Sequence, residues 1–382
     1  MKVFVIAGEA SGDKLGAALM AGLGSLRPDV TFDGVGGPLM QAEGLQSRFP
    51  MEELSVMGLA EILPKYRALK SRIRQMAEAI LADPPDVLIT IDSPDFCLRV
   101  ARLVKAASDI RTVHYVAPTV WAWRPGRAQK MAHHIDHVLA LFPFEPPLMQ
   151  AAGMECDFVG HPVVAEPVAQ EAEAAALGGG TVVLVLPGSR KGEVSRLADR
   201  FGQAVAQIAA AVPDARFVIP TTRGVHDLVQ AQVAAWTAPV TVLPPGSPDK
   251  AGWFKRADVA LAASGTVSLE LAASGTPMVI AYDMAWLSRI IISRMLMVDT
   301  VTLVNLVSET RVVPEFIGKA CQPGPIAEAV LAVLAEPQAQ HDAMALTMTR
   351  LGQGGEAPGL RAARAVLERL EQASVKNQQA EG

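Results

Sequence analysis

The chain has 382 residues, which is long for one ordinary domain and suits two. Half of the residues are hydrophobic and the formal net charge is −5, so the chain can bury sizeable cores and is not a general nucleic-acid-binding protein. No run of about 18 apolar residues is free of charge, which argues against a membrane-spanning helix.

The N-terminal half alternates Val- and Ile-rich runs with amphipathic stretches, the pattern of a parallel, doubly wound sheet. The predicted strands cover residues 3–7, 87–91, 112–116 and 138–142. Helices are predicted at residues 66–81 and 95–107. The first run turns at Gly8 and continues as a domain, so we do not interpret it as a signal peptide.

An Ala-, Glu- and Gly-rich segment at residues 165–181 predicts a domain boundary. After it the strand pattern restarts with TVVLVLP and continues with ARFVIP, VTVLP, DVALAASGT and PMVIAYD. We therefore expect an α/β fold with two Rossmann-like domains facing a cleft, covering residues 1–165 and 166–345. The amphipathic helix at residues 358–373 is expected to pack back on the first domain. Residues 374–382 are polar and are expected to form a disordered tail.

The turn GEASGDKLG after the first strand does not match a phosphate-binding loop. A P-loop needs GxxxxGK[ST], but here three residues separate Gly8 from Gly12 and Asp13 follows. The carboxylates of Glu9 and Asp13 would also repel phosphate. Two interpretations stay open. The loop is a tight turn with Ser11 or Asp13 as helix cap, or it is a site for a hydroxyl-bearing group such as a sugar, on the acceptor side, that uses Glu9, Ser11 and Gly12 and that the Asp13 carboxylate also suits.

The second half contains a better phosphate site. LPGSRKGEV, residues 186–194, ends a strand and opens a helix whose free N–H groups attract anions, and Arg190 can bind a diphosphate through two hydrogen bonds. ASGTVSLE, residues 263–270, repeats this arrangement, and Glu270 can accept hydrogen bonds from ribose hydroxyls. A nucleoside diphosphate site without metal is predicted at Gly188, Ser189, Arg190, Ser264, Gly265, Thr266 and Glu270.

Taken together, these motifs resemble those of the lipid A disaccharide synthases, a family of two-Rossmann (GT-B) glycosyltransferases. The segments that match come in the family's order and cover roughly residues 1–320: GEASGD, GVGGPLM, MGLAEILP, IDSPDF, HYVAPTVWAWRPGR, LFPFE, VGHPV, LPGSRKGEV, ASGTVSLE and the region from LVNLV to VPEF. The alternatives are another UDP-sugar enzyme on the same fold, either a lipid-linked glycosyltransferase or a 2-epimerase, and a non-enzymatic binding module.

The resemblance implies an inverting, metal-independent transfer that needs no cofactor. A 2,3-diacylglucosamine moves from UDP to the 6-hydroxyl of 2,3-diacylglucosamine 1-phosphate, which gives a β-1,6-linked disaccharide 1-phosphate and UDP. The resemblance also implies a cytoplasmic enzyme that is peripheral to the inner membrane.

Inversion requires a base that removes the proton of the attacking hydroxyl. Asp92 directly follows the predicted strand at residues 87–91 and is the candidate, in agreement with the family's pattern. Asp95 competes for this role on the acceptor side, although it could instead cap the helix that follows. We expect the opening loop to lie near Asp92, across the cleft from the UDP.

Further residues are candidates for ligand binding or packing. The resemblance suggests that the segment with Asn305 and Arg311 closes on the donor side or helps ligand binding. Trp121 and Trp123 either pack in the core or form an aromatic platform for acyl chains. Arg124, together with Arg127, is a candidate contact for an acceptor phosphate or lipid headgroups.

Both substrates implied by the resemblance carry acyl chains, so contact with an anionic membrane is expected. Residues 54–75 place apolar side chains before a basic run and are the expected contact. Residues 284–297 are apolar nearly all round, which favours core or homodimer packing. His133, His134 and His137 lack a metal-site pattern and are expected on a solvated helix face. The three cysteines are expected to be reduced core residues.

Overall fold

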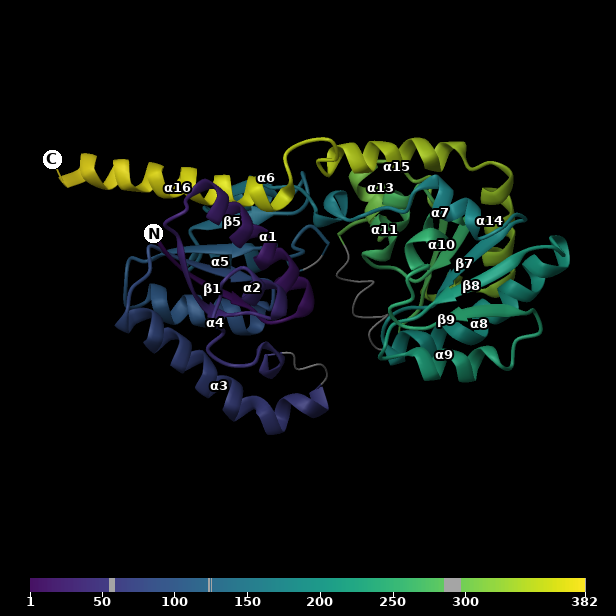
Figure 1. Ribbon diagram of the computed structural model, residues 1–382, viewed down its shortest axis with the longest axis horizontal. Coiled ribbons are helices and arrows are strands. Elements are labelled where there is room, and N and C mark those ends of the chain that lie inside the picture. The colour runs from purple at the N-terminus through teal and green to yellow at the C-terminus, as the bar shows by residue number, and fades with distance from the viewer. Residues whose placement is uncertain (55–58, 123, 125, 285–296, 382) are drawn as a thin grey trace. The chain divides into compact units, whose positions relative to one another are not determined.

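The computed structural model describes residues 1–54, 59–122, 124, 126–284 and 297–381, and for residues 59–66 and 376–381 it describes the backbone alone. The chain divides into two compact units (Figure 1). Unit 1 combines Met1–Ala165 with Gly354–Gly382, and unit 2 is Glu166–Gln353. Each unit is built on a six-stranded sheet in which every pairing between named strands is parallel.

The sheet of unit 1 has the strand order β2-β1-β3-β4-β5-β6. Its strands are β1 (Lys2–Ala7), β2 (Thr31–Val35), β3 (Val87–Ile91), β4 (Arg111–Tyr115), β5 (His137–Ala140) and β6 (Glu155–Phe158). Its helices are α1 (Ala10–Leu26), α2 (Pro38–Ala42), α3 (Leu59–Ala82), α4 (Pro94–Lys105), α5 (Gly126–Ala132), α6 (Pro146–Ala151) and α16 (Pro358–Glu381), with short 3-10 turns η1 (Met51–Glu53) and η2 (Pro162–Ala165).

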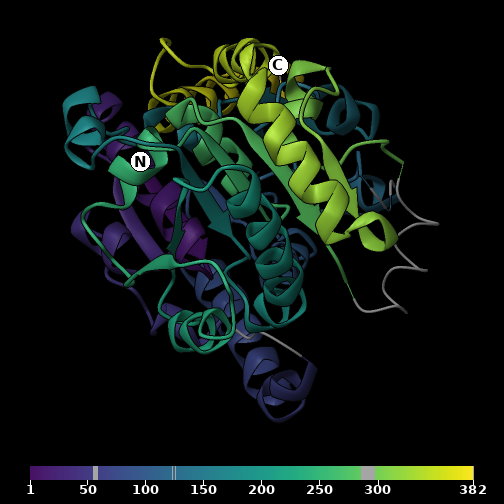
Figure 2. The same cartoon turned by 90° about the vertical axis from the view of Figure 1, so that its right-hand side faces the viewer.

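Unit 2 repeats the architecture with the order β12-β11-β10-β7-β8-β9. Its strands are β7 (Val182–Leu186), β8 (Arg216–Pro220), β9 (Val240–Leu243), β10 (Val259–Ala262), β11 (Met278–Tyr282) and β12 (Glu315–Ile317). Its helices are α7 (Glu171–Ala176), α8 (Lys191–Ala211), α9 (His226–Val233), α10 (Lys250–Arg256), α11 (Val267–Ser274), α13 (Leu303–Ser308), α14 (Pro323–Ala335) and α15 (Gln338–Arg350), with the 3-10 turn η3 (Gly318–Ala320). Figure 2 turns this unit toward the viewer, with the yellow-green helix α14 lying against its sheet beside α8.

The strand order determines which loops lie next to each other at the carboxyl ends of the strands. In unit 1 the order reverses between β1 and β3, and in unit 2 it reverses between β7 and β10. At such a switch point the two loops at the carboxyl ends of the strands diverge, and open α/β sheets bind their ligands there. The segments that follow β1 and β3, and those that follow β7 and β10, therefore occupy the ligand-binding edge of each sheet.

Helix α16 completes unit 1 from the other end of the chain by packing on α1 (Figure 1). The two helix backbones come close because small residues face each other. A Cβ built on Gly22 would lie 2.8 Å from the Gly359 carbonyl oxygen, and one built on Gly359 would lie 2.5 Å from the Ala18 carbonyl oxygen. The expected disordered tail at residues 374–382 is replaced by helix as far as Glu381, since Lys, Gln, Ala and Glu favour helix there.

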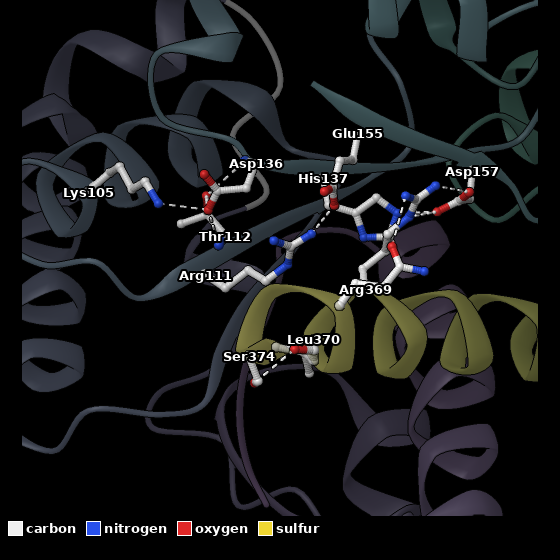
Figure 3. Close-up of polar contacts among 11 residues, drawn as sticks. Lys105, Arg111, Thr112, Asp136, His137, Glu155, Asp157, Arg369, Leu370 and Ser374 are labelled. Atoms are coloured by element: carbon white, nitrogen blue, oxygen red, sulfur yellow. Dashed lines mark hydrogen bonds and ion pairs between the residues drawn. The ribbon is translucent and has the colours of Figure 1, made fainter. Parts of the chain in front are cut away.

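A charged network ties α16 to the sheet (Figure 3). The Arg369 guanidinium donates hydrogen bonds of 2.9 and 2.8 Å to the two carboxylate oxygens of Asp157. The buried His137 ring lies 2.9 Å from the same carboxylate. Burial alone would raise the pKa of Asp157, but the bonds from His137 and Arg369 outweigh it, so the pKa is lowered. The carboxylate is therefore ionised when the unit is folded.

Replacing Arg369 tests this anchor. Because Asp157 has a folded-state pKa below its ordinary 3.8, its stabilisation is present above pH 3.8 and is lost as the pH falls. We expect Arg369→Gln to lower the free energy of unfolding by about 2 kcal/mol at pH 7, measured by urea denaturation. The deficit should shrink below pH 3.8.

Arg364→Gln is the matched control, because Arg364 lies on the same helix and pairs with Glu356 at the exposed surface. Exposed ion pairs contribute little, so this variant should unfold nearly as the parent does. Equal losses in the two variants would mean that the Asp157 network is not an anchor.

Candidate functional site

The loop after β1 and the turn after β3 touch at the switch point of unit 1. A Cβ built on Gly8 would lie 2.5 Å from the Ser93 hydroxyl oxygen, and one built on Gly12 would lie 3.5 Å from the Ile91 carbonyl oxygen. Glycine is therefore required at position 8 for this approach. The opening loop lies against the turn that carries Asp92, with Glu9 and Ser11 exposed and Gly12 buried.

The backbone of this turn is strained. Asp92 and Ser93 have φ values of +50° and +42°, and Val116 after the neighbouring strand has φ +85°. The Asp92 amide donates a 3.0 Å hydrogen bond to the Tyr115 carbonyl, which fixes the turn to β4. Left-handed conformations of this kind cost about 1–3 kcal/mol each and gather at functional sites. The half-buried Asp92 carboxyl is thereby held at the carboxyl edge of the sheet.

Asp95 is exposed in the first turn of α4, where the helix dipole stabilises a negative charge. The N-cap position is taken by Ser93 and has no side-chain cap hydrogen bond. The alternative in which the Asp95 side chain caps this helix is therefore wrong, because the chain already turns into the helix at residue 93.

Asp13 has a role that its sequence neighbourhood does not reveal. Its carboxylate is only 3 % exposed and accepts hydrogen bonds of 2.9, 3.0 and 3.0 Å from the amides of Gly37, Leu39 and Met40. These amides form the amino end of α2. The interpretations of Asp13 as a cap of its own helix or as a sugar contact are therefore wrong, because α2 uses its oxygens.

A buried carboxyl that sequence reasoning missed lies farther along the same edge. Glu145 follows β5 and is 2 % exposed. It accepts hydrogen bonds from the amides of Leu141 and Phe142, at 3.1 and 3.0 Å, and from the Trp121 indole at 3.3 Å. Burial is the largest influence and raises the pKa of Glu145 to about 7, despite these donors. The available signal in the sequence was the apolar and aromatic segment LFPFE, which ends in Glu145.

Trp121 belongs to a small aromatic cluster above this carboxyl. Its ring meets Phe144 edge-to-face with the centroids 5.3 Å apart, and Phe144 stacks on Phe142 at 5.4 Å. Trp121 is half-buried, so the cluster keeps one side toward solvent. Trp123 lies outside the described residues, and the neighbouring Arg124 is exposed with φ +52°.

In unit 2 the amides of the predicted phosphate loop are already hydrogen-bonded to a side chain of the helix that follows, α8. The Ser189 and Arg190 amides donate hydrogen bonds of 3.1 and 3.2 Å to the Glu193 carboxylate, and the Arg190 guanidinium lies 3.1 Å from it. Gly188 has φ +115°, and a Cβ on it would lie 2.6 Å from a Glu193 oxygen. Glu193 thus occupies the position of an anion. The sequence signal for this contact was Glu193 itself, three residues after Arg190 at the N-cap, which is the spacing of a capping box.

The second donor segment stands beside the first, because β7 and β10 are neighbours in the sheet. Thr266 is the N-cap of α11, and Ser264 and Gly265 precede it at the strand end. Glu270 lies in the first turn of this helix, where the Lys250 ammonium is 3.0 Å from its carboxylate. The structure therefore brings the predicted donor residues to one edge and adds Lys250.

Asn305 and Arg311 shape a loop of unit 2. The buried Asn305 amide donates a 2.9 Å hydrogen bond to the Val313 carbonyl and accepts one of 3.0 Å from its amide. The exposed Arg311 forms two hydrogen bonds with Asp299, of 3.0 and 2.5 Å. In this structure both side chains serve the loop between α13 and β12.

The histidines do not share a helix face as expected. His133 is exposed and His134 is half-buried, but His137 is fully buried in β5, where it contacts Asp157. Over the described ranges, no three His, Cys, Asp or Glu side chains group as metal ligands, and the cysteines are free and buried. None of the helices in the same ranges is long and apolar enough to cross a membrane.

The expected membrane segment is only partly described. Met57 lies outside the described residues, as do the side chains of Leu59, Ile62 and Leu63. Residues 285–296, most of the expected core or dimer segment, also lie outside them.

Comparison with known proteins identifies the family to which this chain is similar. A family model described as lipid-A-disaccharide synthetase matches residues 3–366. The lipid-A-disaccharide synthase of Ruegeria pomeroyi is 65% identical over 97% of this chain and 96% of that protein. The enzyme of the same name from Rhodospirillum centenum is 46% identical over 96% of this chain and 94% of its own length.

Solved structures with the same architecture are UDP-sugar enzymes. A putative UDP-N-acetylglucosamine 2-epimerase from Listeria monocytogenes matches with a TM-score of 0.63 and 14% identity, over 100% of this chain and 97% of that one. The UDP-GlcNAc 2-epimerase of Neisseria meningitidis, bound to UDP-GlcNAc, gives 0.61 and 12% identity over 97% and 100%. At this identity the likeness shows the fold, two Rossmann-like α/β units of the GT-B class.

The contact of Gly8 with Ser93 leads to a prediction about stability. Gly8→Ala should lower the free energy of unfolding by about 1–3 kcal/mol, because the added methyl group must displace Ser93 from its strained turn. Gly24→Ala is the matched control, since a Cβ there meets nothing within 4 Å and Gly24 lies inside α1. It should stabilise by up to about 1 kcal/mol. Thermal unfolding of both variants would show opposite shifts; shifts of the same sign would contradict the assigned contact.

Proposed function

The chain belongs to the lipid-A-disaccharide synthetase family of glycosyltransferases, and we propose that it transfers 2,3-diacylglucosamine from UDP to 2,3-diacylglucosamine 1-phosphate. The products are a β-1,6-linked disaccharide 1-phosphate and UDP. The observation that carries the proposal is the gathering of the candidate residues at the switch point of each sheet. Asp92 stands at one of them, and the Arg190 and Glu270 loops stand at the other.

Asp92 is the proposed base in unit 1. Its carboxylate takes the proton of the acceptor 6-hydroxyl while that oxygen forms a bond with the anomeric carbon of the donor. The bond between this carbon and the diphosphate oxygen breaks, and UDP leaves with the electron pair. Attack on the face opposite the leaving group inverts the anomeric configuration. The strained turn supports this role because it fixes the carboxylate before substrate arrives. Asp95, Glu9, Ser11 and Gly12 are the proposed acceptor-side neighbours.

The donor side is proposed to bind UDP through the loops of unit 2. The Ser189 and Arg190 amides and the Arg190 guanidinium can stabilise the negative charge that grows on the diphosphate. Glu193 now holds these amides, so its carboxylate must swing away before a phosphate takes its place. Glu270 is the proposed ribose contact, and its partner Lys250 orients it. Ser264, Gly265 and Thr266 supply the second helix start.

Association with a membrane follows from the acyl chains of both proposed substrates. We propose peripheral attachment at the cytoplasmic face of the inner membrane through residues 54–75, which reach into α3. The exposed Arg67, Lys70 and Arg74 of this helix support attraction to anionic lipid. The apolar segment 284–297 is proposed as core or homodimer packing.

An assay with the two lipid substrates tests the reaction. The parent chain should form disaccharide and UDP, and Asp92→Asn should lower kcat by about 10²- to 10⁴-fold while UDP still binds. Asp95→Asn is the control on the same turn and should keep most of the activity. Loss confined to Asp95→Asn would transfer the role of base to Asp95. Absence of product with the parent, or interconversion of UDP-sugar epimers instead, would refute the proposed reaction.

Calorimetric titration with UDP tests the donor site. Arg190→Ala removes a charge-assisted contact and should weaken UDP binding about 10- to 100-fold. Glu193→Gln removes the competing charge and should tighten UDP binding several-fold, since the amide oxygen can still accept from the helix start. Glu173→Gln changes the equivalent capping carboxylate of α7, away from the loop, and should leave the affinity unchanged. Weaker binding in Glu193→Gln would show that Glu193 is a donor-side contact rather than a competitor.

A further inference from the structure

A basic pocket opens between α4 and α5 on unit 1, apart from the strand ends described above. Its volume is about 210 Å³. The lining residues are Leu98, Arg99 and Arg102 from α4, Arg127, Lys130 and Met131 from α5, and His134. Four cationic side chains thus surround a space with an apolar component from Leu98 and Met131. Pockets for whole nucleotides or drug-sized ligands run from about 300 Å³ upward, so this one suits a smaller group.

The cations of this basic pocket have no acidic partner among the side chains that the structure describes. Within the described part of the chain, the Arg99, Arg102, Arg127 and Lys130 side chains form neither hydrogen bonds nor ion pairs. Other arginines of the same unit are paired, such as Arg48 with Asp33, Arg72 with Glu53 and Arg369 with Asp157. The chain as a whole carries a net charge of −5, so acidic residues are plentiful. The four cations of this pocket therefore stay unpaired in the described structure although acidic residues outnumber basic ones.

The pKa values of two histidines, His134 and His114, are lowered in part by the cations of the pocket. The buried Nε2 atom of His134 has no hydrogen-bond partner in the described structure. The pKa of His134 is lowered by burial and then by the charge of Arg102. Burial also lowers the pKa of His114, to about 3, with His134 and Arg127 adding to the effect. Like charges held together raise the free energy of the protein, and an anion in the pocket would remove this cost.

We propose that this basic pocket binds a phosphate group carried by a lipid. Guanidinium groups bind phosphate oxygens through paired hydrogen bonds, and several cations can neutralise its full charge. Leu98 and Met131, which line the pocket, offer apolar surface for the part of the lipid next to the phosphate. Two sources share this chemistry: the headgroup of an anionic phospholipid and the 1-phosphate of the proposed acceptor.

The position of the pocket connects it to the reaction, and this link rests on the proposed function. Helix α4 begins at Pro94, directly after the turn that carries Asp92. Arg99 lies about 8 Å along the helix axis from this start, at 1.5 Å per residue. A lipid held by the pocket is therefore anchored on the same helix that follows the candidate base.

Vesicle binding by charge-matched variants tests the pocket. The test variant is Arg102→Gln with Arg127→Gln, and the control is Arg27→Gln with Arg364→Gln, which removes two positive charges from exposed pairs elsewhere on unit 1. If a phospholipid headgroup is the source, the test variant should bind vesicles of phosphatidylglycerol and phosphatidylcholine about tenfold or more weakly than the parent, and the control nearly as the parent does. Vesicles of phosphatidylcholine alone give the baseline. If the test variant does not fold, Arg99→Gln with Lys130→Gln at exposed positions replaces it.

Two further measurements separate the sources of the phosphate. A titration with inorganic phosphate followed by ³¹P NMR should show binding to the parent and the control that is lost in the test variant. A raised KM for the acceptor lipid with unchanged vesicle binding would assign the acceptor phosphate, whereas weaker vesicle binding with unchanged KM would assign the phospholipid headgroup. Equal behaviour of the test and control variants with phosphate, vesicles and acceptor would overturn the proposal. The phosphate and vesicle arms need no turnover, so they stand if the proposed reaction fails.

Discussion

The close approach of Gly8 to Ser93 is the constraint on which the carboxyl edge of unit 1 depends. Because residue 8 has no side chain, the loop after β1 can lie directly against the turn after β3. That turn keeps two consecutive non-glycine residues, Asp92 and Ser93, in the left-handed region. The surrounding buried strands over-determine this conformation, so its cost is met by packing elsewhere in the sheet. The same relation recurs in unit 2, where Gly188 leaves room for the Glu193 carboxylate.

Buried or half-buried carboxylates do much of the positioning. Asp13 accepts hydrogen bonds from three backbone amides at the start of α2. Glu145 accepts them from two amides and an indole, and Glu193 accepts them from two amides at the start of α8. In each case the carboxylate replaces the partners that a helix start or a tight turn leaves without hydrogen bonds. Acidic residues at the carboxyl edge of a sheet are therefore not all candidate ligand contacts. In the described part of the chain the Asp92 carboxylate holds no backbone amide, which separates it from these three.

The sequence predicted the central strands because they are buried on both faces and read as unbroken apolar runs, as in β3 and β7. The strands that it missed, β2, β6 and β12, all lie at sheet edges, where solvent permits residues such as Asp33, Glu155 and Glu315. The candidate loops were found from local patterns of turn and helix start. The roles of Asp13 and Glu145 were not, because their donors belong to other turns or come from tertiary contacts. The switch points depend on strand order, which no local pattern contains.

The contact between α1 and α16 also sets an order of assembly during synthesis. All residues of unit 2 form one continuous stretch, Glu166–Gln353, and leave the ribosome before Gly359 does. Unit 1 begins first but must wait for the end of the chain, because Ala18 and Gly22 of α1 lack their partner helix until then. The first unit to be translated is thus the last to be complete. A message cut short before codon 358 would yield a complete unit 2 and a unit 1 with one side open.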